Sequence, residues 1–91
     1  MNDKPVRRED VTCKQLDETE TMLYDPQTEA LHILNPTARL IWELCDGEHT
    51  VEDMAAALKA QFTGVEGKDI SGEIQTTLDT FTAQGLLRPD N

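Results

Sequence analysis

The stretch Leu34-Asn-Pro-Thr-Ala-Arg-Leu-Ile-Trp-Glu-Leu-Cys-Asp-Gly47 decides the fold of this 91-residue chain. Asn35 is a favoured N-cap residue, because its side-chain oxygen can accept a hydrogen bond from an amide of the first turn. Pro36 suits the first helical position, where its missing N–H costs nothing. The stretch has a wide apolar face that includes Trp42, so we expect a largely buried helix. Asp46-Gly47 gives the stop, since glycine adopts the left-handed conformation that ends helices.

Three short segments that precede this helix are typical of strands. Residues 11–16 alternate in part, residues 21–24 follow, and residues 30–34 are apolar except for His32. Between the second and third segments, Asp25-Pro26-Gln27-Thr28 places Asp and Pro where a type I turn prefers them. The sequence therefore predicts a three-stranded antiparallel meander.

Two further helices are expected after the buried helix of residues 34–47. Thr50 and Asp53 have the spacing of a capping box ahead of a helix over residues 51–62. Residues 63–67 break that helix, and Asp69 can cap a third one, which Gly85 ends. The buried stripe of the third helix is Ile70, Ile74, Leu78 and Phe81. A small sheet needs a helix layer on one face, so we predict an α+β fold: a three-stranded antiparallel sheet followed by three helices, winged-helix-like.

Length and composition support one domain with a single modest core. Residues 1–10 are polar and lack periodicity, which predicts a flexible N-terminal arm, with the domain over residues 11–88 and a tail over 89–91. No apolar run approaches the roughly 20 residues that span a membrane, and no signal peptide is recognisable, so we expect a cytoplasmic protein. Two cysteines, Cys13 and Cys45, are too few for a disulfide scaffold.

The charge balance argues against two classes of partner. The net charge is −10, from 18 acidic against 8 basic residues. Nucleic-acid affinity depends on Lys and Arg that neutralise phosphates, so neither nucleic acid nor an anionic membrane is expected to bind. The first two helices also fit a helix-turn-helix, which leaves a winged-helix DNA-binding regulator as an alternative. However, the expected third helix, residues 69–84, carries no base with which to contact DNA.

The sequence offers no set of residues suited to catalysis. His32 and His49 lie on a strand and in a loop, with no Cys or His at metal-ligand spacing. Glycine-rich phosphate loops and nucleophile motifs are also missing from the sequence. We therefore expect a protein that is not an enzyme and that needs no metal and no cofactor. A small structural subunit of an enzyme complex is another alternative.

Peptide binding at a sheet edge is the function that the pattern favours. The third strand comes last in the meander, so an extended peptide can add beside it. About four main-chain hydrogen bonds contribute roughly 2–6 kcal/mol, and apolar pockets must supply the rest of the roughly 8 kcal/mol that micromolar binding requires. The third helix is the natural second wall, although an ordinary solvated helix face fits its spacing equally well. The predicted peptide-binding residues are Glu29, Ala30, Leu31, His32, Ile33, Glu73, Thr76, Thr77, Thr80 and Gln84.

The chain resembles the PqqD-like family. The likeness rests on Leu34-Asn35-x-Thr37-Ala38-x-x-Ile41-Trp42-x-Leu44-x-Asp46-Gly47-x-x-Thr50-Val51, with Asp69-Ile70, Leu78 and Gly85-Leu86-Leu87, and it covers residues 11–88. This family includes the pyrroloquinoline quinone biosynthesis protein D and the recognition elements for ribosomally made, modified peptides (RiPP recognition elements). Residues 24–42 look more like the generic group than like the quinone-pathway protein, so the resemblance does not identify which precursor peptide is bound.

The resemblance implies both a fold and a role in natural product biosynthesis. The fold is three strands followed by a three-helix, winged-helix-like unit. The role is that of a non-catalytic peptide chaperone, a monomer or weak dimer. It binds the leader segment of a precursor peptide as an added strand between the third strand and the third helix. It then presents the peptide to a modifying enzyme, often a radical S-adenosylmethionine (SAM) enzyme. Asn35, Trp42 and Gly47 are then interpreted as cap, core and stop residues that touch no ligand.

Overall fold

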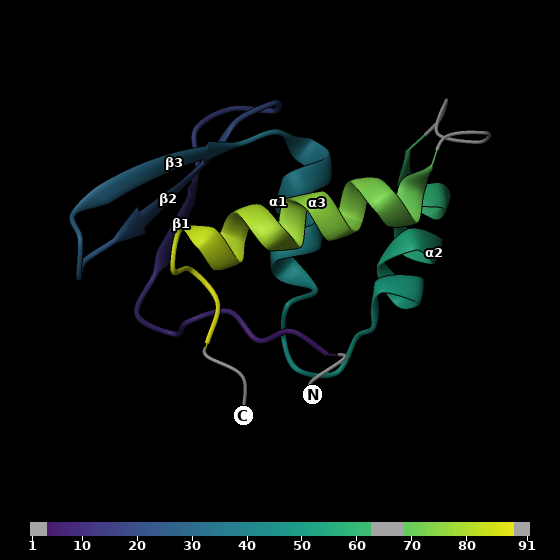
Figure 1. Ribbon diagram of the computed structural model, residues 1–91. Helices are drawn as coiled ribbons and strands as arrows, with labels where there is room; N and C mark the ends of the chain where they lie inside the picture. Colours follow the sequence, from purple (N-terminus) through teal and green to yellow (C-terminus); the bar gives the residue numbers. More distant parts are fainter. Residues whose placement is uncertain (1–3, 63–68, 89–91) are drawn as a thin grey trace.

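The computed structural model describes residues 4–62 and 69–88, and within them the chain forms three strands and then three helices. These are β1 (Thr12–Gln15), β2 (Thr21–Asp25), β3 (Ala30–Leu34), α1 (Pro36–Glu43), α2 (Val51–Gln61) and α3 (Ile70–Ala83). In Figure 1 the sheet lies at one side of the molecule, and α3 crosses the helical side with its C-terminal end toward the sheet. The predicted α+β order is confirmed. The predicted break at residues 63–67 lies outside the described residues.

The sheet is the predicted meander, with strand order β1-β2-β3 and both pairs antiparallel. The turn between β2 and β3 is one residue longer than the type I turn that the sequence predicts. Glu29 adopts a left-handed conformation with φ of 61°, and its N–H donates to the Asp25 carbonyl at 2.7 Å. The Asp25 carboxylate also accepts a hydrogen bond from the Gln27 N–H at 2.9 Å. Asp25 therefore closes the turn with both its carbonyl and its side chain.

The helices begin at the residues that the capping signals predict. The Asn35 side-chain oxygen accepts a hydrogen bond from the Ala38 N–H at 2.8 Å. Thr50 and Asp53 exchange both hydrogen bonds of a capping box, at 3.0 and 3.1 Å. The Asp69 carboxylate accepts a hydrogen bond from the Gly72 N–H at 3.0 Å. Each cap satisfies an amide that the first helical turn would otherwise leave unpaired.

The first helix, α1, is shorter than the sequence predicts: it ends at Glu43 and not near Gly47. Leu44 N–H also bonds to the Ile41 carbonyl and Cys45 N–H bonds to the Trp42 carbonyl, so the last turn tightens after Glu43. Asp46 then pairs with Val6 as an isolated bridge.

The core lies between the inner face of the sheet and the three helices. Trp42 of α1 meets Phe81 of α3 edge-on, with ring centroids 5.5 Å apart, a favourable aromatic geometry. The side chains of Leu23, Met54 and Ile74 bring one strand and two helices into the same core and are fully buried. The stretch from Leu34 to Gly47 therefore supplies the centre of the core, as predicted.

Within the range predicted as a flexible arm, residues 1–10, the described residues 5–8 make main-chain hydrogen bonds that the sequence does not predict. Arg7 N–H donates to the Cys45 carbonyl at 2.8 Å, and Arg8 N–H donates to the Leu86 carbonyl at 3.0 Å. Residues 5–8 therefore lie between the α1–α2 loop and the segment after α3. Such pairing joins residues far apart in the sequence, so it leaves no local periodicity from which to predict it.

The Arg8 side chain fastens this N-terminal segment to the sheet. Its guanidinium donates to both carboxylate oxygens of Asp25, at 2.9 and 3.0 Å, and to the Gly85 carbonyl at 2.7 Å. It also pairs with Asp10 at 2.7 Å. The Asp25 side chain has no exposed surface, so this two-pronged pair neutralises a buried charge.

Among the described residues, no helix combines the length and the apolar character that crossing a membrane requires.

Candidate functional site

The candidate site begins at β3, which forms one edge of the sheet because the strand order is β1-β2-β3. The ladder shows which way the backbone of each strand faces. Leu16 N–H donates to the Glu20 carbonyl at 2.9 Å, so the backbone of Glu20 faces β1. In an antiparallel ladder, successive residues direct their N–H and C=O groups to opposite sides. Leu23, three residues after Glu20, therefore faces β3.

The same alternation fixes which groups of β3 are available at its edge. Leu23 is the register partner of His32, so the main-chain groups of His32 face β2. Those of Leu31 and Ile33 then face away from the sheet. Two N–H and two C=O groups are thus directed to the open side of β3, which is the number that the sequence analysis assumed for strand addition.

The side chains of β3 divide between two faces. Ala30 and His32 are half-buried on the core side, while Leu31 and Ile33 are 60% and 54% exposed on the outer side. The His32 Nε2 atom is buried and makes no hydrogen bond within the described part of the chain. Glu29 precedes the strand and is exposed in the turn.

A hollow of about 680 Å³ opens next to the end of β3, between α1 and α3. Asn35, which directly follows β3, lines it together with Thr37 and Ala38 of α1. From the opposite side, α3 contributes the predicted residues Glu73, Thr76 and Thr77. Further lining residues are Ile41, Leu58, Asp69, Ile70, Gly72 and Ile74. The structure thus places three of the predicted α3 residues around a hollow next to the end of β3, while none of the predicted residues 29–33 lines it.

The α3 wall of the hollow is less polar than its sequence suggests. The hydroxyl of Thr77, which lines the hollow, donates to the Glu73 carbonyl at 2.9 Å. A hydroxyl that bonds to its own helix backbone has used its hydrogen. What such a threonine offers a ligand is a methyl group and an acceptor oxygen, so this wall suits apolar side chains.

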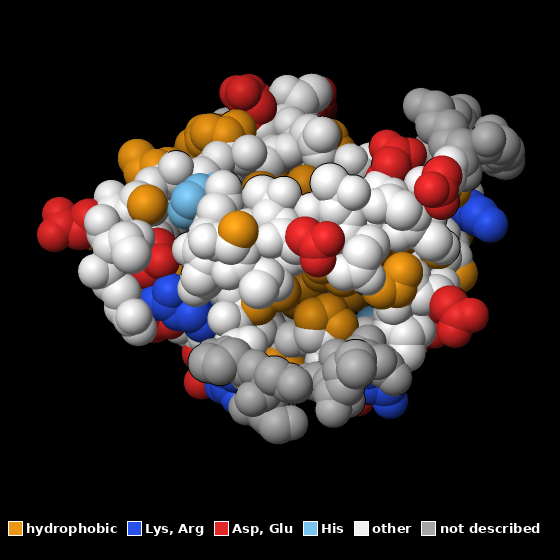
Figure 2. Space-filling model, viewed as in Figure 1, with side chains coloured by type: hydrophobic (Ala, Val, Ile, Leu, Met, Phe, Trp, Pro, Cys, Tyr) orange, Lys and Arg blue, Asp and Glu red, His pale blue; other side chains and the backbone are white. Residues whose placement is uncertain are grey.

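The charged side chains among the described lining residues of the hollow have one sign. These are the carboxylates of Asp69 and Glu73, and no Lys or Arg is among the described residues that line it. Figure 2 shows the same trend over the face that α3 crosses, where acidic and apolar side chains lie on the helix and basic ones lie at the periphery. A peptide side chain with an apolar stem and a positively charged end, such as Lys or Arg, would complement both the apolar lining and the carboxylates of Asp69 and Glu73.

Seven of the ten predicted residues lie outside the hollow, namely residues 29–33, Thr80 and Gln84, and nine of its twelve described lining residues were not predicted. Thr80 and Gln84 are exposed further along α3, on the helical row that Glu73 and Thr77 begin. The sequence interprets Asn35 as a cap that touches no ligand, yet Asn35 lines the hollow together with Thr37 and Ala38. An N-cap follows the strand directly, and that adjacency was the one sequence signal that could have placed them here.

The fold and its open edge define a class: a small α+β domain in which an open edge strand ends next to a hollow bounded by helices. The chain matches the family described as "Coenzyme PQQ synthesis protein D (PqqD)" over residues 20–87, and it belongs to that family. The family resemblance predicted from the sequence is thereby confirmed.

Two solved structures share this fold along almost their whole length. The first is described as "TbiB1 in Complex with the TbiA(beta) Leader Peptide" and has a TM-score of 0.77 at 20% identity, covering 94% of this chain and 98% of that one. The second is described as "Lasso peptide synthetase B1 complexed with the leader peptide" and has a TM-score of 0.78 at 24% identity, covering 94% and 99%. No curated protein matches the chain.

Proposed function

We propose that this protein is a peptide chaperone without catalytic activity that binds the leader segment of a ribosomally made precursor peptide. The leader adds to β3 as a fourth strand, antiparallel to it or parallel, and hydrogen-bonds to the main chain of Leu31 and Ile33. The observation that carries the proposal is the open edge of β3 beside the hollow. Family membership supports it, as do two solved structures of the same fold, each described as a complex with a leader peptide.

The hollow supplies the affinity that main-chain bonds alone do not. Roughly four hydrogen bonds contribute about 2–6 kcal/mol, whereas micromolar binding requires about 8 kcal/mol. Each apolar side chain that becomes fully buried adds about 1.5–3 kcal/mol, so one or two of them close the difference. In this proposal the peptide places such side chains against the half-buried Ala38 and Thr77, and a Lys or Arg beside Glu73.

The bound peptide is presented to a modifying enzyme, which we propose to be of the radical SAM class. The domain works in the cytoplasm, where ribosomal precursors are made. A purely structural subunit would bind the enzyme but not the isolated leader, and a DNA-binding regulator would bind neither. Binding of the leader in the absence of the enzyme therefore separates the three roles.

Two proline substitutions on adjacent residues test strand addition. Ile33→Pro removes an N–H that faces the open edge, where proline is tolerated, so it should weaken leader binding by at least about tenfold with the fold retained. His32→Pro is the matched control, because it removes an N–H that faces β2 and should destabilise the sheet itself. Fluorescence anisotropy with the labelled leader encoded beside this chain measures binding, and circular dichroism follows unfolding. Wild-type affinity in a folded Ile33→Pro variant would rule out this edge as the binding site.

A further inference from the structure

The outer face of the sheet carries a second candidate surface, separate from the hollow. The large hydrophobic side chains that are exposed within the described residues are Leu16, Leu31 and Ile33, at 48%, 60% and 54% exposure. All three belong to this face, because the register pairs Met22 with Ile33 and alternation places Leu16 on the same side. In Figure 2 apolar side chains gather along the β3 side of the sheet.

Apolar residues on this face are unexpected for a sheet of this kind. An antiparallel sheet with one face on the core ordinarily alternates, with apolar residues inward and polar residues outward. Here the inward residues of β2 include Thr21 and Asp25, while its outward residues are Met22 and Tyr24. The apolar residues on the outer face therefore extend from β3 across β2 to Leu16, directly after β1. A contiguous exposed patch of this kind marks an interaction surface.

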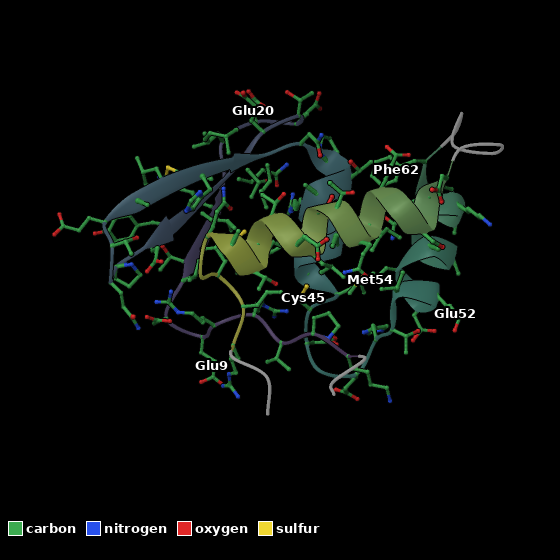
Figure 3. The ribbon with its side chains drawn as sticks, viewed as in Figure 1. Glu9, Glu20, Cys45, Glu52, Met54 and Phe62 are labelled. Carbon is green, nitrogen blue, oxygen red and sulfur yellow. The ribbon has the colours of Figure 1, made fainter. Side chains whose placement is uncertain are left out.

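The patch has an acidic border. Glu18 and Glu20 lie in the turn between β1 and β2, Glu29 lies in the turn at the other end of β2, and all three are exposed. Figure 3 shows Glu20 at the end of the sheet where β1 turns into β2. Lys14 is the one basic residue that the register places on this face.

We propose that the outer face of the sheet is where the peptide-modifying enzyme docks, through an apolar contact with basic residues around it. This inference rests on the proposed function. A second copy of the chain fits poorly, because it would bring two acidic borders and two net charges of −10 together. An enzyme surface with Lys and Arg around an apolar centre complements both parts of the patch.

The position of the patch gives the docking a consequence for the peptide. Leu31 and Ile33 offer their main chain to the edge and their side chains to the outer face, so the two surfaces meet at β3. In a strand added to β3, every second side chain points to the outer face. An enzyme docked there contacts the bound peptide as well as the sheet, and it therefore binds the loaded chaperone more tightly than the empty one.

Substitutions away from β3 test the docking independently of peptide binding. Leu16→Glu, directly after β1, and Met22→Glu, in β2, place a charge on the outer face of the sheet. Ala56→Glu and Ala60→Glu on the exposed side of α2 are matched controls. The binding partner is the purified radical SAM enzyme encoded beside this chain, measured by biolayer interferometry with and without leader. We expect the outer-face variants to bind the enzyme at least about tenfold more weakly, and to bind labelled leader within about twofold of wild type.

The charged border has its own test. Glu18→Lys and Glu20→Lys should slow association with the enzyme by about threefold or more at low salt, and less at high salt. If Leu16→Glu and Met22→Glu bind both the leader and the enzyme as wild type does, the outer face is not the docking surface. A wild-type protein that binds the leader but not the enzyme would contradict the proposal equally. Sedimentation that shows a wild-type dimer, lost in these variants, would assign the face to self-association instead. Absence of leader binding in every variant and in wild type would contradict the proposed function itself.

Discussion

At the scale of single residues, Asp25 does more than its place in a turn suggests. It closes the β2–β3 turn and also receives both prongs of the Arg8 guanidinium, so it ties the start of the chain to the strand before β3. The sequence predicts only the turn, because Asp followed by Pro is a local signal. The pairing with Arg8 joins residues 17 positions apart, and nothing in the spacing indicates it.

The pair predicts a loss of stability in acid. Hydrogen bonds from Arg8 and from the Gln27 amide lower the pKa of Asp25 below its ordinary value near 3.8. A carboxyl whose pKa is lower in the folded state stabilises the fold above its unfolded pKa, and that contribution disappears as the pH falls through the folded pKa. We expect wild-type stability to decline below about pH 4, and Asp25→Asn to be less stable at pH 7 with a flatter pH dependence.

Urea unfolding followed by the fluorescence of the buried Trp42 measures this difference between pH 7 and pH 2.5. Asp79→Asn, on the exposed side of α3, is the control and should follow the wild-type curve. If Asp25→Asn shows the same loss of stability in acid as wild type, the Arg8 pair does not contribute as described.

At the scale of elements, the sequence predicts what depends on neighbours in the chain. The three caps at Asn35, Thr50 and Asp69 set the helix starts, and the structure places α1, α2 and α3 one residue after each. The end of α1 was predicted too late, since Asp46 pairs with Val6 from the far end of the chain. Local signals therefore fixed the beginnings of the helices better than their ends.

The candidate site shows the same division. The edge position of β3 follows from a meander in which it comes last, and of the five residues predicted there Leu31 and Ile33 direct their main-chain groups to the open side. For α3, the spacing of the residues identifies which helix faces are polar, but not which neighbouring element each polar face lies against. The structure directs Glu73, Thr76 and Thr77 toward α1, and it adds Asn35, which the sequence explains fully as a cap. Because the N-cap role accounts for Asn35 completely, the sequence gives no sign that Asn35 also lines the hollow.

The acidic rim of the hollow predicts a charge preference that belongs to α3. Glu73→Lys places a positive charge beside the expected Lys or Arg of the leader, so it should weaken leader binding by about fivefold at low salt. The substitution also opposes the dipole of the first helical turn. Glu52→Lys, in the first turn of α2, is therefore the matched control, and it should leave binding unchanged.

Anisotropy titrations at low and high salt test this preference. The difference between Glu73→Lys and wild type should shrink as salt screens the charges. Tighter binding by Glu73→Lys would mean that the hollow takes an acidic or neutral segment.

At the scale of the whole molecule, two surfaces of the sheet do not pack on the helices: the open edge of β3 and the outer face. These two surfaces meet at β3. The inner face of the sheet packs on the helices, the edge of β3 is open, and the outer face carries the apolar patch. Peptide and enzyme can therefore bind together without competing for the same atoms. The net charge of −10 suits a protein whose partners are basic and keeps copies of the chain apart.

Amide hydrogen exchange of β3, with and without the leader, tests the central claim most directly. The account predicts an alternating result: bound leader slows exchange at Leu31 and Ile33, whose N–H groups face the open edge. It leaves Ala30 and His32 nearly unchanged, because their N–H groups already face β2. A leader that binds tightly while Leu31 and Ile33 exchange as in the free protein would contradict strand addition at this edge.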